Sequence, residues 1–402
     1  MRIINENIVV LSFYFLFFFF IIIGAYSPVL GFYIPLIFLA LTAVTARKFR
    51  TIIVFIAIFN GAFIVASRNY IYGSPIDDFY NIYYPVYEYV RSGGTIFYTD
   101  FSGGIEFILP LYFKVLSLIY LSSAQVYVLA SVSFLCYFLF YLWLEFYGME
   151  KIDSTKQSLC IASALGLMNI LVTTQSMRQA LSSCFVLFAI SMYRHRQRKR
   201  ALVFFILSVC AHTTGLIFAP LFSILLYGNK RIKLILLSII LLISVFFGAF
   251  ISVALSLNIF GAATYKLLYY TSTEITQVSE LGIDNLKFLF ICVILSFFFF
   301  ARDKIEYKSL LLYGIVIFIA LLPIPVLPAR FMFLVYYYLI GYILFLSAYK
   351  ISNVYRIVLI IFLIYKTVKL IMGDGSFTGD NVFWNLWYSY PSTGDELFYY
   401  IR

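Results

Sequence analysis

The sequence predicts an all-α polytopic integral membrane protein with about twelve transmembrane helices, some short or re-entrant, and two external loops. Composition is the first reason. Of the 402 residues, 63% are hydrophobic and only 12% are charged, which is more apolar side chain than a water-soluble fold buries. The second reason is that apolar runs approaching the about 20 residues of a membrane helix recur along nearly the whole chain. A single transmembrane domain over residues 1–402 is therefore expected.

The apolar runs give about thirteen candidate membrane segments. They cover approximately residues 9–26, 29–45, 51–66, 105–121, 126–144, 158–173, 179–193, 201–227, 234–256, 286–301, 309–327, 331–349 and 357–372. The first run follows one arginine and one glutamate, and no small-residue cleavage pattern comes after it. We therefore expect a retained signal anchor rather than a removed signal peptide.

Basic clusters between the apolar runs predict the orientation of the chain. They span residues 47–50, 194–200, 230–233 and 302–308, and the positive-inside rule places them at the cytoplasmic face. The net charge of +11 is concentrated in these short loops instead of forming a continuous basic face. This distribution argues against nucleic acid as a partner.

Two apolar segments are predicted to be shorter than a full crossing. Residues 201–227 lie between two basic clusters, which favours two short arms that meet at residues 211–215 and are buried in protein. Residues 105–121 form a candidate half-crossing, because the run is interrupted by Glu106, Pro110 and Lys114. The number of crossings between residues 67 and 178 stays open.

Two polar segments are predicted to be external. Residues 67–104 form a loop rich in tyrosine and aspartate, and residues 373–402 form an acidic tail that contains Trp384, Trp387, Tyr388 and Tyr390. Aromatic faces with acidic groups between them suit sugar rings. The alternative for any one of these tyrosines is an aromatic belt at the level of the lipid headgroups.

Several kinds of chemistry are disfavoured by the motifs that the sequence lacks. It has no Walker loop, GxGxxG, HExxH or CxxC motif, which argues against nucleotide-driven chemistry. The five cysteines stand singly inside apolar runs, with no spacing that suits a metal site: Cys136, Cys160, Cys184, Cys210 and Cys292. No cofactor and no metal are expected.

Ionisable residues beside apolar runs are candidates for function, because a charge inside the bilayer is costly unless it faces protein or water. Arg178, followed by Gln179, begins a helix whose far end carries a basic cluster, so it is expected on the external side. A snorkelling arginine is the alternative. His212 lies at the turn between the two short arms, where an imidazole can accept a proton near neutral pH or bond a carbonyl.

Three further charges complete the set of candidates. Glu106 follows a glycine pair that permits close backbone approach to a ligand, and Arg330 follows the proline-rich stretch PIPVLPA at the expected external start of a helix. Lys369 shares a helical face with Lys366 near the external end of the last apolar run. If Arg178, Arg330 and Lys369 converge, they form a cationic site suited to a pyrophosphate.

Three motifs carry a resemblance to a known family. They are the external loop with Asp77, Asp78, Phe79, Tyr80, Tyr83, Tyr84 and Tyr87; the stretch from Glu106 to Tyr112; and Arg178-Gln179-Ala180-Leu181, which leads through a basic loop to Ala211-His212-Thr213-Thr214-Gly215-Leu216. In these motifs, roughly residues 67–345 resemble the EpsG-like family of bacterial polysaccharide polymerases, the Wzy-type enzymes. The chain departs from the family pattern at Ser182, where a small alanine is usual, and at residues 213–215, which replace a Ser-Ala setting.

The resemblance implies a glycosyltransferase of the bacterial inner membrane that polymerises lipid-linked repeat units of O-antigen, capsule or exopolysaccharide. The implied substrate is an oligosaccharide on undecaprenyl pyrophosphate, which is its own leaving group. Arg178 and Arg330 would bind the departing pyrophosphate, and His212 or Glu106 would orient or deprotonate the acceptor hydroxyl. The implied substrate-binding residues are Asp77, Asp78, Tyr80, Tyr84, Gln179 and Lys369. The implied partners are the lipid bilayer, a chain-length regulator and a flippase.

Two other functions fit parts of the pattern. A flippase for the same lipid-linked sugar should show internal repeats and charges at mid-helix, whereas the charges here gather on one expected face. An O-antigen ligase or another glycosyltransferase that uses a polyprenyl-phosphate sugar is close in chemistry, and the pair Asp77 and Asp78 would suit its base. A membrane acyltransferase fits less well, because its histidine is expected in a longer and more polar helix pair.

Overall fold

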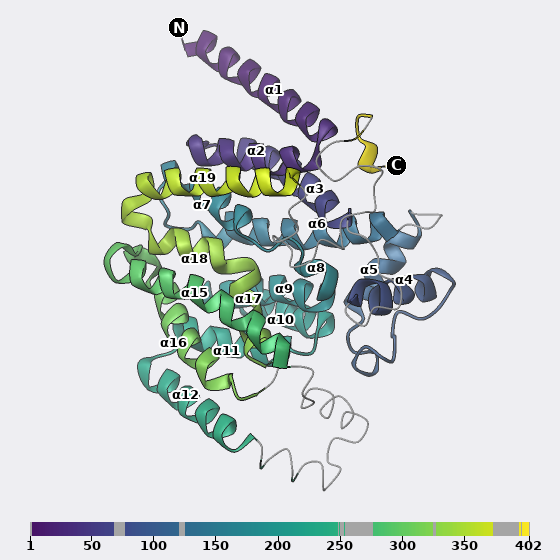
Figure 1. The fold of residues 1–402 in the computed structure, drawn as a ribbon, viewed down its shortest axis with the longest axis vertical. Helices are drawn as coiled ribbons and strands as arrows, with labels where there is room; N and C mark the ends of the chain where they lie inside the picture. Colours follow the sequence, from purple (N-terminus) through teal and green to yellow (C-terminus); the bar gives the residue numbers. More distant parts are fainter. Residues whose placement is uncertain are drawn as a thin grey trace. The chain divides into compact units, whose positions relative to one another are not determined.

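A computed structural model gives the fold of the chain (Figure 1). It describes residues 2–67, 77–119, 125–247, 249, 253, 276–324, 327–372, 394 and 396–401, with side chains omitted for residues 2–13 and 276–285. Within these ranges every regular element is helical. The predicted all-α class is therefore confirmed for the part of the chain that the structure describes.

The helices fall into two compact units. The first comprises residues 1–217 and 352–402, and the second comprises residues 218–351. The single domain that the sequence predicts thus has two internally packed parts.

The first unit contains the N-terminal helices and the last long helix. Its elements are α1 (Arg2–Tyr26), α2 (Pro28–Leu41), α3 (Arg47–Ala66), η1 (Phe79–Tyr83), α4 (Tyr84–Arg91), η2 (Ser102–Gly104), α5 (Ile108–Ser117), α6 (Gln125–Trp143), η3 (Leu144–Gly148), α7 (Ser154–Gly166), α8 (Val172–Gln175), α9 (Met177–Arg194), α10 (Arg198–Ala211), the start of α11 (Gly215–Tyr227), α19 (Ser352–Ile371) and η10 (Tyr399–Ile401). The largest packing contacts join α9 with α10, α2 with α3, and α3 with α6. Helix α19 lies along α2 although the two are far apart in sequence (Figure 1).

The second unit contains the remaining helices. They are the rest of α11, α12 (Lys230–Val245), α15 (Thr276–Phe299), η5 (Arg302–Lys304), α16 (Ile305–Leu321), α17 (Leu327–Leu334), η6 (Val335–Leu339), α18 (Ile340–Ser347) and η7 (Tyr349–Ile351). Lys233 on α12 donates to Ser309 on α16 over 2.5 Å, and the rings of Phe222 and Phe331 stack between α11 and α17. These contacts show that polar and aromatic side chains together hold the unit.

The predicted break into two short arms is confirmed, but their expected burial in protein is wrong, because apolar side chains such as Leu202 and Ile206 on α10 and Ile217 on α11 are exposed. Residues 198–227 form two helices, α10 and α11, which are interrupted at residues 212–214. The candidate half-crossing contains the ten-residue helix α5, which rises only about 15 Å and is too short for the about 30 Å hydrocarbon core. Lys114 on this helix donates to the carbonyl of Val90 on α4, so α5 is held against α4 instead of standing alone.

Among the described residues, three helical stretches are long and apolar enough to cross a membrane: Arg47–Ala66, Gln125–Gly148 and Leu327–Ser347. Others are apolar but shorter, such as Pro28–Leu41 and Gly215–Tyr227. The chain therefore contains helices that can span a membrane. The predicted number of about twelve crossings stays a prediction, because the helix lengths alone do not support it.

Glycine allows three N-terminal helices to approach one another closely. A Cβ added at Gly31 on α2 would lie 2.5 Å from the side chain of Asn60 on α3 and 2.6 Å from the backbone of Gly24 on α1. Tyr400 of η10 donates to the carbonyl of Gly24 and to Asn60 Oδ1. The C-terminal turn is thereby bound to the junction of α1 and α3.

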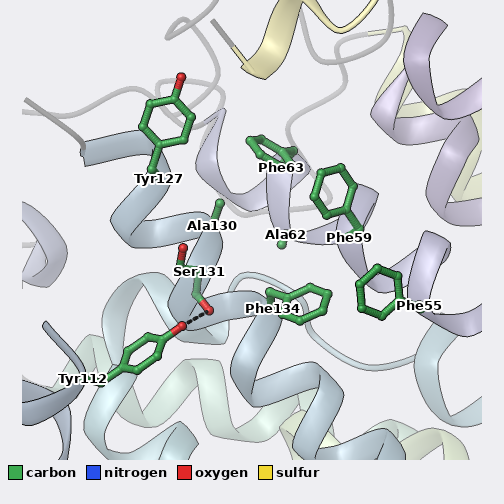
Figure 2. A pocket seen from close by; sticks show the side chains of 9 residues that line it. All are labelled: Phe55, Phe59, Ala62, Phe63, Tyr112, Tyr127, Ala130, Ser131 and Phe134. Carbon is green, nitrogen blue, oxygen red and sulfur yellow. Dashed lines mark hydrogen bonds between the residues drawn. The ribbon is translucent and has the colours of Figure 1, made fainter. Parts of the chain in front are cut away.

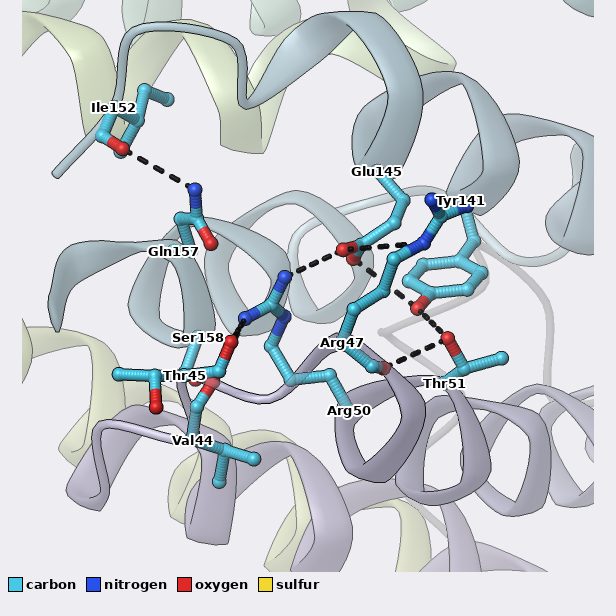
Figure 3. Close-up of polar contacts among 10 residues, drawn as sticks. All are labelled: Val44, Thr45, Arg47, Arg50, Thr51, Tyr141, Glu145, Ile152, Gln157 and Ser158. Carbon is cyan, nitrogen blue, oxygen red and sulfur yellow. Dashed lines mark hydrogen bonds and ion pairs between the residues drawn. The ribbon is translucent and has the colours of Figure 1, made fainter. Parts of the chain in front are cut away.

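A buried ion pair joins α3 to η3, which directly follows α6 (Figure 3). Arg50 Nη2 lies 2.5 Å from Glu145 Oε1, and both side chains are almost fully buried. Arg50 also donates to the carbonyls of Val44 and Thr45, while Tyr141 donates to the second oxygen of Glu145. One member of the first basic cluster is therefore neutralised within the protein, so it serves packing as well as orientation.

The predicted external loop and tail are described in part. Within the loop, η1 and α4 give residues 79–91 helical structure, whereas residues 68–76 lie outside the described residues. Of the tail, only Gly394 and residues 396–401 are described, so Trp384, Trp387, Tyr388 and Tyr390 lie outside the described residues. The external location of both segments stays a prediction.

Candidate functional site

Three of the four residues expected to be catalytic lie together in the first unit. Glu106 lies two residues before α5, Arg178 is in the first turn of α9, and His212 lies between α10 and α11. Two shorter side chains, Ser102 and Thr213, complete the group. We call these five residues the Glu106 cluster.

Glu106 is the centre of the cluster. Its side chain is fully buried, and its Oε2 lies 2.5 Å from Arg178 Nη1. Its Oε1 accepts hydrogen bonds from Ser102 Oγ at 2.9 Å and from the amide and hydroxyl of Thr213, both at 2.8 Å. Both carboxylate oxygens are thus bonded, which fixes the orientation of the side chain.

The backbone before Glu106 makes a tight turn that aims the carboxylate. Gly103 and Gly104 both have positive φ, at 67° and 88°, which glycine adopts without steric cost. Ser102, also at positive φ, uses its hydroxyl to bond Glu106 Oε1. The glycine pair, expected to allow close approach to a ligand, therefore forms the turn that presents Glu106.

Arg178 is held between the carboxylate and an aromatic wall. Its guanidinium carbon lies 3.9 Å from the ring centre of Phe101 and 5.9 Å from that of Tyr83. The side chain keeps 19% of its surface exposed, and its Nε is buried with no hydrogen-bond partner. A buried donor without a partner is unusual in a folded protein and fits a position where a ligand binds.

His212 is placed beside the same carboxylate. Its Nδ1 lies 3.0 Å from Glu106 Oε1, close enough for an ion pair but outside the angular range of a hydrogen bond. The ring is 19% exposed, and the neighbouring Thr214 hydroxyl is buried without a hydrogen-bond partner. Together with Arg178 Nε, this gives the site two buried polar groups that a bound molecule can satisfy.

The charge state of Glu106 follows from these contacts. Burial alone would raise its pKa and is the largest single influence, but His212, the Thr213 amide and Arg178 together outweigh burial. The pKa of Glu106 is therefore held well below its ordinary value. The residue is a carboxylate at neutral pH and a weak proton acceptor.

Helix ends add to the positive potential of the site. Glu106 lies two residues before α5, Arg178 is the second residue of α9, and Thr213 lies two residues before α11. The N-terminal end of a helix carries a partial positive charge and free amide groups, both of which favour anions. Three helix starts thus lie at the Glu106 cluster, and the Glu106 carboxylate is the anion that they and Arg178 stabilise in this structure.

Four of the residues expected to bind substrate lie at η1 and α4. Asp77 is fully buried and its carboxylate accepts the amide of Tyr80 at 3.1 Å, while the amide of Asp78 donates to Gln175 Oε1 at 3.0 Å. Tyr84 stacks on Tyr87 with 5.8 Å between ring centres. The buried Asp77 thus caps a helix start, and Gln175 ties this segment to α8, just before Arg178.

The other expected residues lie elsewhere. Gln179 is buried beside Arg178 on α9. Lys369 is near the end of α19, with its Nζ 5.2 Å from the ring centre of Tyr365 on the same helix, and it is not a member of the Glu106 cluster. Arg330 is on α17 in the second unit. The structure therefore brings together Glu106, Arg178 and His212, while the convergence of Arg178, Arg330 and Lys369 stays a prediction.

Four residues of the site were given no role by sequence reasoning: Ser102, Phe101, Thr213 and Gln175. Ser102 and Phe101 are four and five residues before Glu106, and Thr213 follows His212, so proximity to the charged candidates was the available signal. Gln175 is an ordinary polar residue whose role depends on a pairing with Asp78 across 97 positions. No local sequence pattern predicts such a pairing.

The fold and the cluster define a helical membrane protein with a buried carboxylate, an arginine and an imidazole at one site. The chain belongs to the EpsG family, whose sequence model matches residues 63–392 and so includes every residue of the Glu106 cluster. This membership indicates a polymerase-like, glycosyltransferase-like role in polysaccharide biosynthesis. No curated protein and no solved structure matches the chain.

Proposed function

We propose that the chain polymerises oligosaccharide repeat units carried by undecaprenyl pyrophosphate into a surface polysaccharide, by en bloc glycosyl transfer at the external face of the bacterial inner membrane. The observation that carries this proposal is the Glu106 cluster, in which one buried carboxylate orients both Arg178 and His212. An anion-binding arginine and a proton acceptor side by side are what this reaction requires.

Arg178 binds the pyrophosphate that leaves. The bond between the anomeric carbon of the growing glycan and the pyrophosphate oxygen breaks, and negative charge grows on that oxygen in the transition state. A guanidinium with an unpaired Nε, at the start of α9 and beside two other helix starts, stabilises this charge. Arg178 contributes more to the transition state than to the ground state for this reason.

His212 takes the proton of the acceptor. The hydroxyl oxygen of the incoming repeat unit attacks the anomeric carbon while its proton passes to the imidazole. Glu106 beside Nδ1 favours the tautomer protonated at that nitrogen, which leaves Nε2 as the basic atom. The lowered pKa of Glu106 makes this carboxylate a positioning group, so of the two expected bases His212 is favoured.

The remaining expected residues take supporting roles in the proposal. The tyrosines of η1 and α4 and the tryptophan-containing tail hold the glycan, because aromatic faces stack on sugar rings. Arg330 and Lys369 add positive charge for the lipid pyrophosphate. A flippase that delivers the lipid-linked unit and a regulator of chain length are the expected protein partners.

Surface polysaccharide banding on a gel tests the function. A deletion strain carries the wild type, Arg178→Ala or His212→Ala, and membrane levels of each protein are measured by blot. We expect both variants to display single repeat units but no long ladder. Matched controls are Arg91→Ala, which removes an exposed arginine paired with Glu88, and His195→Ala, which removes the histidine paired with Glu150.

The outcomes separate the competing functions. Loss of the ladder with a single repeat unit still displayed supports polymerisation and places the residue in the site. Absence of any repeat unit at the surface favours a flippase, and a ladder that forms but is not attached to its lipid acceptor favours a ligase. A normal ladder from both variants would show that neither Arg178 nor His212 is required for polymerisation.

A further inference from the structure

Helices α3, α5 and α6 line an aromatic groove in the first unit (Figure 2). Phe55, Phe59 and Phe63 line it from α3, Ala130 and Phe134 from α6, and Tyr112 from α5. Its volume is about 270 Å³. Both long walls belong to helices that are long and apolar enough to cross a membrane.

The two tyrosines in the lining use their hydroxyls for bonds within the protein. Tyr112 donates to the carbonyl of Ser131 at 3.2 Å, and Tyr127 donates to the carbonyl of Ile401 (Figure 2 shows the first of these bonds). The phenol rings therefore present apolar faces to the groove. Ser131 also lines the groove, but the other lining side chains are aromatic or alanine, and both phenol hydroxyls already bond carbonyls. An apolar chain is therefore the occupant that such a lining favours.

Helix α5 links the groove to the Glu106 cluster along the chain. Glu106 lies two residues before this helix, and Tyr112 is the fifth residue within it. At the helical rise of 1.5 Å per residue, Tyr112 lies about 6 Å along the helix axis from Ile108, the first residue of α5. A molecule with a charged head at the cluster can therefore place an attached apolar tail in the groove.

The two ends of the groove differ. Phe63 and Tyr127 are at the ends of α3 and α6, and here Tyr400 of the C-terminal turn packs on Phe63 with 5.2 Å between ring centres. Phe55 and Phe134 lie toward the middle of the same helices, where their rings meet edge to face at 5.2 Å. From Phe63 to Phe55 the groove descends about 12 Å along α3, which is less than half of the hydrocarbon core.

We propose that this groove binds the first isoprene units of the polyisoprenoid carrier, so that the pyrophosphate is held at Arg178 and the glycan on the external side. The proposal rests on the proposed function, which supplies a substrate with a pyrophosphate head and a polyisoprenoid tail. Tail binding raises the residence time of the carrier at the cluster, and it holds the pyrophosphate head close to Arg178.

Photolabelling of the full-length protein tests the groove without requiring polymerisation. The protein is placed in nanodiscs of phosphatidylethanolamine and phosphatidylglycerol, and the probe is undecaprenyl pyrophosphate with a diazirine on its second isoprene unit. We expect labelled peptides from α3, α5 and α6 that contain Phe59, Tyr112 and Phe134. A phosphatidylethanolamine with the same diazirine on an acyl chain tests occupation by ordinary bilayer lipid.

Variants that fill the groove give the decisive comparison. Ala130 is only 5% exposed and lines the groove, so Ala130→Trp should reduce labelling by the carrier probe at least about tenfold through steric exclusion, and Ala130→Leu by a smaller factor. The leucine variant keeps the test valid if the tryptophan variant does not fold. Ile361→Trp is the control, because Ile361 is 62% exposed on α19 outside the groove.

The outcomes distinguish this inference from the proposed function. Labelling that ignores the groove-filling variants, or equal labelling by the phospholipid probe, overturns the inference. Elongation of lipid-linked repeat units by a wild type that carries no label in the groove leaves the polymerase standing and removes the tail site. If labelling of the groove falls in Ala130→Leu but the wild type elongates no lipid-linked repeat unit, the tail site is kept and the polymerase function is rejected.

Discussion

Arg178 combines a charge with a directional fork of donors, a shape that matches the oxygens of a phosphate group. Its Nη1 is engaged by Glu106 while its Nε has no hydrogen-bond partner. A lysine at this position would keep the charge but present a single ammonium group. The shape of the guanidinium therefore carries part of the expected activity.

Arg178→Lys should reduce the rate of chain elongation about a hundredfold with little loss of protein, a magnitude typical of removing one oxyanion donor. The rate is measured with purified protein and a lipid-linked repeat unit. Arg91→Lys is the matched control, because Arg91 is exposed and pairs with Glu88. This variant should elongate at the wild-type rate. An unchanged rate in Arg178→Lys would show that charge alone is sufficient there.

Glu106→Gln should lower the thermal stability at pH 7, because it leaves the Arg178 guanidinium without its buried counter-charge. Removing one partner of a buried ion pair costs about 3 kcal/mol. The pKa of Glu106 is lower in the folded chain than in the unfolded chain, so its stabilisation is complete above the ordinary carboxyl pKa of about 4.3 and is lost as pH falls below it.

The melting temperatures of wild type and Glu106→Gln, compared in detergent from pH 8 to pH 3, check this dependence. The difference between them should stay constant down to about pH 5 and shrink only at lower pH. A difference that disappears between pH 7 and pH 6 would instead mean that the carboxylate takes up a proton near neutrality. The proposed division of roles between Glu106 and His212 would then be reversed.

Glu106, Arg178 and His212 were predictable from the sequence because each is an ionisable residue beside an apolar run, where charge is costly. Their mutual contact was not predictable, since Glu106 and Arg178 are 72 positions apart. Ser102 and Thr213 were missed for a related reason. A hydroxyl is common in any loop, and its importance depends on which carboxylate the fold brings to it.

At the scale of elements, the turn between α10 and α11 shows what patterning can determine. Two basic clusters that flank one apolar stretch predicted a break at residues 211–215, and the structure breaks at residues 212–214. The helical structure of residues 79–91 was not expected in a segment assigned to a loop. The tyrosines and acidic residues of this segment obscure the helical period in the sequence. In the structure, burial of Phe79, Val86 and Tyr87 stabilises the helix.

Gly31→Ala tests the close packing of α1, α2 and α3. The added methyl group would lie 2.5 Å from Asn60 and 2.6 Å from the backbone of Gly24, so the helices must separate, at a cost of about 1–3 kcal/mol. We expect a lower melting temperature and less protein in the membrane, with elongation per molecule largely retained. Gly314→Ala is the control, because its methyl group meets Met332 at an ordinary 3.4 Å.

At the scale of the whole molecule, the proposed chemistry requires the Glu106 cluster and the basic loop after α9 to lie on opposite sides of the membrane. Helix α9 runs from Met177 to Arg194, with Arg178 in its first turn and the basic cluster of residues 194–200 at its other end. Its 18 residues rise about 27 Å, close to the thickness of the hydrocarbon core. Helix α9 is not one of the three described stretches that are apolar enough to cross a membrane by composition, so the external position of Arg178 stays a prediction of the positive-inside rule.

Single cysteines report this orientation in intact cells. Thr95→Cys, exposed between α4 and η2, should react with a membrane-impermeant maleimide added outside, whereas Lys199→Cys, exposed at the start of α10, should react only after the inner membrane is opened. Four of the five native cysteines are buried, and Cys210 is replaced by serine in both variants to remove the half-buried thiol. Reaction of Lys199→Cys from outside, with Thr95→Cys protected, would place the Glu106 cluster in the cytoplasm. The substrate of the cluster would then have to be one that is present on that side, and polymerisation after export would be excluded.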